Sequence, residues 1–129
     1  MKYLQVYLVM MFFYVILDIS WVGFIAKSFY YVRLQHLLSP NVNWIAVILF
    51  YFIFISGLLA FVVNPFYKET TFIYILYAAA FGLTTYSTFN LVNLALLNNW
   101  SIIVTIVDCC WGMFISTVVC LAGRWALIL

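Results

Sequence analysis

Charge is the scarcest property of this chain: five Lys or Arg and three Asp or Glu make up 6% of its 129 residues. Hydrophobic residues make up 70%, and the mean hydropathy is +1.23. Soluble domains are about 25% charged, so this chain has too little polar surface to cover a water-soluble globule. The composition therefore excludes a soluble domain and predicts an integral membrane protein.

Basic clusters and metal or redox motifs are missing as well. The net charge is only +2, and no run of Lys or Arg indicates binding to nucleic acid or to anionic lipid. The single histidine, His36, cannot supply both axial ligands of a b-type haem, and no Cys/His set makes a zinc site. The three cysteines form no Cys-x-x-Cys pair, which argues against a quinone-coupled thiol oxidoreductase. We therefore expect no cofactor and no metal, and we assign no catalytic residue.

Four apolar stretches are long enough to cross a bilayer, which takes about 20 residues. The breaks between them carry Pro and Asn, and the predicted spans are 3–26, 44–63, 71–96 and 101–122. We expect one domain, residues 1–129, folded as an all-α integral membrane bundle of four transmembrane helices. The connection 27–43 is the longest, and it predicts either a short interfacial helix or an extension of the first span.

The few cations predict an orientation. With four spans, both termini lie on one side of the membrane, together with Lys2, Lys68 and Arg124. The other side carries Lys27 and Arg33. Because cationic residues favour the cytoplasmic side, the termini are expected in the cytoplasm.

Two of the three acids lie inside predicted spans, where a carboxylate costs about 2.5–3.5 kcal/mol to insert. Counted from the side opposite the termini at about 1.5 Å per residue, Asp18 is roughly 12 Å deep and Asp108 roughly 10 Å deep. Asn90, Asn93 and Tyr51 fall at similar depths on the other two spans. We therefore expect one polar layer to which all four helices contribute.

Helical spacing extends this layer to neighbouring side chains. Residues three or four positions from these polar groups share their helix faces, and an Asp-x-x-Trp sequence occurs in the first and fourth spans. The predicted pocket comprises Tyr14, Asp18, Trp21, Tyr51, Tyr86, Asn90, Asn93, Asp108 and Trp111. His36 and Arg33, in the first connection, are predicted as its cap.

Two interpretations of this layer remain open. The acids either complete a hydrogen-bond network that holds the helices together, or they form a pocket for a proton, a cation or a polar head group. The leading hypothesis is a small multi-pass protein that binds or moves a proton-coupled small solute or a lipid-like molecule. In a chain of 15.0 kDa, a transport path predicts a homodimer. The alternatives are an accessory subunit of a membrane complex and, third, a lipid-modifying enzyme with the acids as general acid and base.

Local motifs add a resemblance over nearly the whole chain. They are Asp18–Gly23, Phe29–Tyr30, Leu34–Leu38 with Pro40 and Trp44, Phe50–Tyr51, Tyr86–Asn93 with Trp100, and Asp108–Gly112. In this combination the chain resembles a domain-of-unknown-function family of small bacterial membrane proteins with four spans. The resemblance implies the four-helix fold and a bacterial inner membrane, and it carries no activity.

Overall fold

The computed structural model describes residues 1–129 and is entirely helical, which confirms the predicted all-α membrane bundle. In chain order the elements are α1 (Lys2–Ser20), the π-helical η1 (Trp21–Ile25), α2 (Lys27–Leu34), α3 (Trp44–Leu58), the π-helical η2 (Leu59–Val63), α4 (Asn64–Phe66), α5 (Thr71–Leu96) and α6 (Ile102–Ile128). Four continuous stretches are long and apolar enough to cross a membrane: Lys2–Ile25, Trp44–Phe66, Thr71–Leu96 and Ile102–Ile128.

The fourth span is longer than the sequence predicts, since it continues past residue 122 to Ile128. Arg124 is accommodated in this extra stretch because its long side chain reaches the neighbouring connection. Its guanidinium lies 4.9 Å from the centre of the Tyr74 ring, and Nη2 donates to the backbone oxygen of Glu69 at 2.9 Å. A cation satisfied in this way need not end the helix.

Polar side chains cap the start of three spans. The side chains of Asn43, Thr70 and Ser101 each accept a hydrogen bond from a backbone N–H three residues further on. Each cap satisfies one of the N–H groups that a helix start leaves without a partner. Between α5 and α6, Asn99 adopts a left-handed φ of 59°, a conformation that asparagine tolerates. This conformation lets the chain reverse direction within a short connection.

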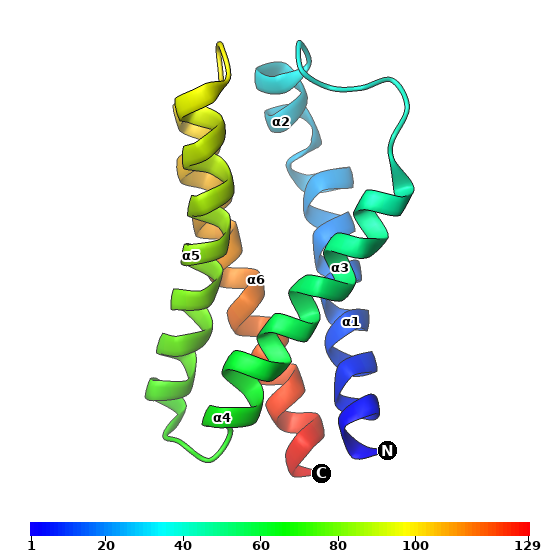
Figure 1. Ribbon diagram of the computed structural model, residues 1–129, viewed down its shortest axis with the longest axis vertical. Coiled ribbons are helices and arrows are strands. Elements are labelled where there is room, and N and C mark those ends of the chain that lie inside the picture. Colours follow the sequence, from blue (N-terminus) through cyan, green and yellow to red (C-terminus); the bar gives the residue numbers. More distant parts are fainter.

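The helices pack around α6 (Figure 1). Helix α5 runs antiparallel along α6, and α1 packs on another side of it. Helix α3 crosses the bundle obliquely: η2 and α4 lie near α5 at the end that holds both termini, whereas the start of α3 leans away from α5 toward the far end. Helix α2 follows the first span at that far end as a separate short helix, because the span ends at Ile25 and Ala26 leaves the helical conformation.

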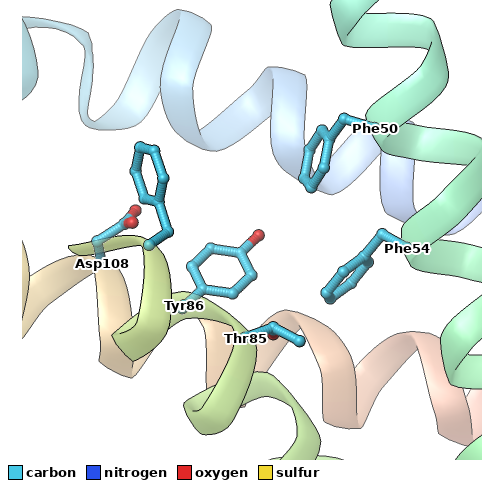
Figure 2. Close-up of a pocket in the computed structure, with 6 residues that line it drawn as sticks. Phe50, Phe54, Thr85, Tyr86 and Asp108 are labelled. Atoms are coloured by element: carbon cyan, nitrogen blue, oxygen red, sulfur yellow. The ribbon is translucent and has the colours of Figure 1, made fainter. Parts of the chain in front are cut away.

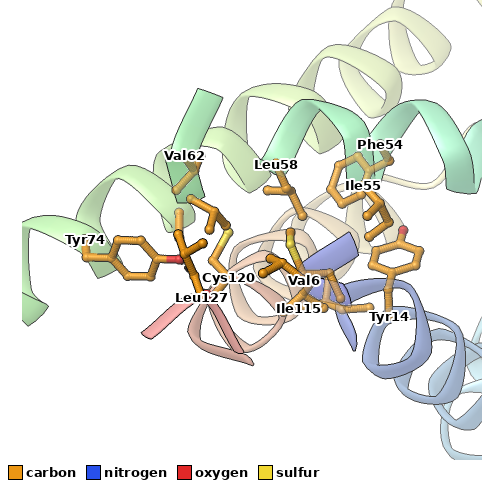
Figure 3. Packing of buried hydrophobic residues seen from close by; sticks show 14 residues of the cluster. Val6, Tyr14, Phe54, Ile55, Leu58, Val62, Tyr74, Ile115, Cys120 and Leu127 are labelled. Carbon is orange, nitrogen blue, oxygen red and sulfur yellow. Dashed lines mark hydrogen bonds between the residues drawn. The ribbon is translucent and has the colours of Figure 1, made fainter. Parts of the chain in front are cut away.

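The half of the bundle near the termini is filled by hydrophobic side chains (Figure 3). This cluster joins 14 buried residues from all four spans, and Tyr14 lies at its edge beside the polar layer. The polar groups are therefore confined to the other half of the bundle, and they do not form a continuous polar path from one end to the other.

Helices α5 and α6 approach to backbone contact at Gly82. A methyl group at Gly82 would collide with the carbonyl oxygen of Gly112 and would lie 2.6 Å from Ser116 Oγ. A methyl group at Gly112 would in turn collide with the Tyr86 ring. Small residues at such a crossing let two helices come close and gain van der Waals contacts. Inside a membrane these contacts drive helix association, because the hydrophobic effect does not favour contact with protein over contact with lipid.

Candidate functional site

Asp108 is the point at which three separate segments meet. Tyr30 of α2 donates its hydroxyl hydrogen to Oδ1 at 2.9 Å, and Asn90 of α5 donates from Nδ2 to Oδ2 at 2.6 Å. The indole N–H of Trp21 in η1 donates to the Tyr30 oxygen at 3.1 Å. The half-buried carboxyl of Asp108 is therefore held by two neutral donors from two other helices. The indole of Trp21 in turn orients one of these donors, the Tyr30 hydroxyl.

Asp18 has its own set of partners. Tyr51 of α3 donates to Asp18 Oδ2 at 2.9 Å. The indole N–H of Trp111 in α6 lies toward the same carboxyl without completing a hydrogen bond of normal geometry. This carboxyl therefore ties α1 to α3.

Two indoles connect the acids. The rings of Trp21 and Trp111 stack with centroids 4.6 Å apart and planes 8° from parallel. Each Trp follows an acid by three residues in sequence but serves the acid of the other helix, because α1 and α6 are antiparallel. The repeated Asp-x-x-Trp sequence thus forms a crossed pair: Trp21 supports the partners of Asp108, and Trp111 faces Asp18.

Two tyrosines form the floor of the layer. The hydroxyls of Tyr14 and Tyr86 lie 2.9 Å apart, and Tyr14 is fully buried. Asn90 is also fully buried and makes a second hydrogen bond to the Tyr86 carbonyl at 2.9 Å. Asn93 is half-buried and makes no side-chain hydrogen bond, and it has no ring contact of the kind that joins Trp111 to the layer.

The two predicted cap residues do not reach the acids. The Arg33 guanidinium lies 4.2 Å from the centre of the Phe29 ring on its own helix, and Nη1 donates to the Phe29 carbonyl at 3.2 Å. His36 is exposed beyond the end of α2. The residue that α2 does bring to the layer is Tyr30. Burial raises the pKa of Tyr30, so its hydroxyl keeps its proton and remains a donor.

A pocket of about 340 Å³ opens beside Asp108, between α3 and α5. Its lining consists of Phe50, Phe54, Thr85, Tyr86, Phe89 and Asp108. Figure 2 shows Asp108 on one side, Phe50 and Phe54 of α3 on the other, and Tyr86 between them. Phe50 and Phe89 are 43% and 57% exposed, so the opening faces outward from the bundle. The pocket is therefore aromatic, open toward the outside of the bundle, and lined by a single carboxyl group.

Most of this lining could not be picked out in the sequence. Phe50 and Phe54 lie one turn apart on α3, and Thr85 and Phe89 lie one turn apart on α5. Their spacing is that of a shared helix face, but in a membrane chain an apolar face is equally suited to lipid. Tyr30 gave no such signal either, since a helix continued past Ala26 leads away from the layer, and only the placement of α2 brings its hydroxyl to Asp108.

The site contains no partner of opposite charge and no cluster of metal ligands. All of the hydrogen-bond donors to Asp18 and Asp108 are neutral side chains. No three His, Cys, Asp or Glu residues come close enough together to hold a metal ion. The arrangement can therefore accept hydrogen bonds or a positive charge from a bound molecule.

The comparisons with known proteins agree with this architecture. A family model described as "Predicted membrane protein (DUF2177)" matches residues 3–125, which run from the first span into the last. No curated protein and no solved structure matches the chain.

Proposed function

The chain belongs to this family of membrane proteins, and from that premise we propose that it binds a lipid-like amphiphile in the pocket between α3 and α5. The amphiphile places its polar head group at Asp108 and its apolar part along the phenylalanine rings. The single observation that carries this proposal is the pocket itself, with one carboxyl at one side of an aromatic lining whose rings Phe50 and Phe89 are partly exposed.

The lining favours an amphiphile over a polar solute. Four of the six lining residues are hydrophobic, and a water-soluble molecule would have to leave water to reach them. A molecule already dissolved in the bilayer enters without that cost and gains contacts with the rings. A volume of about 340 Å³ lies at the lower end of the range for small-molecule sites, roughly 300–1,000 Å³. It accommodates a head group and the first part of a chain.

Filling the pocket tests this proposal. Thr85→Trp places a large ring in the lining and is expected to reduce binding about tenfold, because the space is no longer free. Photoreactive alkyl probes in lipid nanodiscs measure the binding as cross-links to the peptides that carry Phe50 and Phe89. Thr88→Trp is the matched control, since Thr88 lies one turn along α5 and is exposed outside the pocket. Equal cross-linking in both variants would contradict the proposal.

A second role, in helix packing, is favoured for Asp18 by a specific contact. Its carboxyl does not line the pocket, and it accepts the Tyr51 hydroxyl at 2.9 Å. We expect Asp18→Leu and Tyr51→Phe to be non-additive, with a coupling of about 1 kcal/mol, as for other hydrogen bonds between membrane helices. Unfolding of the two single variants and the double variant in mixed micelles measures it. Fully additive losses would remove the packing role.

The proposed orientation has the termini in the cytoplasm of a bacterial inner membrane. Figure 1 places both termini at the end of the bundle that also holds α4, and α2 at the opposite end. Lys2, Lys68 and Arg124 thus lie opposite Lys27 and Arg33, an excess of one cation. An impermeant thiol reagent on intact cells is expected to label Ser39→Cys and not Lys68→Cys, and the reverse pattern would overturn the orientation.

A homodimer is not required for this binding role. All six residues of the pocket come from one chain. We therefore propose the lipid bilayer and a bound amphiphile as the immediate partners, and a second copy of the chain only where transport across the membrane takes place.

A further inference from the structure

The site around Asp108 has more hydrogen-bond acceptors than donors. Asn90 uses both hydrogens of Nδ2, one toward Asp108 and one toward the Tyr86 carbonyl. The side-chain oxygen of Asn90, Oδ1, is fully buried and has no hydrogen-bond partner. A buried acceptor without a donor costs free energy, and the adjacent carboxyl of Asp108, which unlike Asn90 lines the pocket, can accept further hydrogen bonds from a ligand.

The site also lacks positive charge. The two groups that donate to Asp108, a phenol and an amide, are both neutral. Arg33 of α2 is turned onto the Phe29 ring instead. An ionised carboxyl in a membrane protein is normally paired with a cation, and the chain supplies none here.

The other walls of the pocket suit a cation as well as an acyl chain. Phe50, Phe54, Phe89 and Tyr86 present aromatic rings around the space beside the carboxyl. The electron-rich face of an aromatic ring attracts an ammonium group, and this attraction is stronger where water is excluded. Carboxyl and rings together complement a positive head group.

Building on the proposed function, we propose that the amphiphile is a long-chain amine, bound as a protonated ammonium that donates hydrogen bonds to the carboxyl oxygens of Asp108. A primary or secondary ammonium has N–H donors for these acceptors. A quaternary ammonium has charge but no donor, and an alcohol has one donor but no charge. The geometry therefore ranks the three head groups, with the primary amine first.

Three probes with the same chain and the same photoreactive group test this ranking. They carry a primary amine, an alcohol or a trimethylammonium head, and they are cross-linked to the protein in nanodiscs of zwitterionic lipid at neutral pH. Labelling of the peptides with Phe50 and Phe89 is divided by labelling of the exposed outer residue Phe72, which corrects for partition into the bilayer. We expect the amine to label the pocket at least about tenfold more than either other probe, the gain typical of a charge-assisted bond.

Two variants separate the contributions. Asp108→Asn is expected to bring the amine down to the level of the alcohol, whereas Glu69→Gln, which removes the exposed third acid, leaves the ranking unchanged. Equal pocket labelling by amine and alcohol in the wild-type protein would overturn the amine assignment and leave the amphiphile site standing. Absence of pocket labelling by all three probes would instead overturn the site itself.

Discussion

Gly82→Ala is expected to cost the protein about 2–3 kcal/mol of stability, the upper part of the range for overpacking a tightly packed contact. The added methyl group has nowhere to go, because the Gly112 carbonyl oxygen and Ser116 Oγ already occupy that space. Helices α5 and α6 must then separate. Their separation pulls Asn90 away from Asp108, so amphiphile binding falls together with stability. Unfolding in mixed micelles by increasing SDS fraction measures the loss.

The control for this variant is Gly23→Ala, the same change at an exposed glycine. A methyl group there meets only the Ile19 side chain at 3.8 Å, which is ordinary contact. Because alanine is a better helix former than glycine by up to about 1 kcal/mol, this variant is expected to be neutral or slightly more stable. Similar losses at Gly82 and Gly23 would show that the α5–α6 approach is looser than the structure has it.

Asp108→Leu is expected to abolish binding and to destabilise the fold by about 2 kcal/mol, because a fully buried amide and a half-buried phenol lose their acceptor. Tyr30 Oη and Asn90 Nδ2 both donate to this carboxyl, and leucine accepts neither bond. Asp108→Asn keeps one carbonyl oxygen and is expected to recover most of the stability while binding of the amine stays weak. The contrast between these two variants separates the structural share of Asp108 from its charge.

Unfolding in mixed micelles measures the change in stability, and cross-linking of the amine probe measures the change in binding. Asp18→Asn adds a comparison, since Asp18 lies in the same layer but outside the pocket lining. Loss of amine binding in Asp18→Asn as large as in Asp108→Asn would mean that the two acids act as one site. Full amine binding in Asp108→Leu would contradict the assignment of the head group to Asp108.

Hydropathy was sufficient to predict the four spans, and residue depth placed each acid with a side chain that donates to it. The acids stand out because charge is rare in this chain, and depth along a helix follows directly from residue count. Asp18 with Tyr51, and Asp108 with Asn90, are hydrogen-bonded pairs drawn from residues that depth alone grouped together. These pairs join different helices, which no spacing within one span could specify.

Other features depend on packing between helices, and the sequence does not encode them visibly. Tyr30 joins the layer only because the π-helical η1 carries the chain onward into α2. Arg33 and His36 looked suitable as a cap because of their charge and position, but the Phe29 ring holds Arg33 and His36 extends into solvent. The close approach at Gly82 depends on a partner in another helix, the backbone at Gly112, which the sequence around Gly82 does not reveal.

The most direct test of the central claim is an experimental structure of the protein crystallised from a lipid mesophase. The account predicts the Asp108 carboxyl between Tyr30 and Asn90, facing a lateral opening between α3 and α5 in which an amphiphile head group is bound. Carboxyls of Asp18 and Asp108 at unrelated depths, or α3 packed flush against α5 with Phe50 touching Phe89, would contradict it.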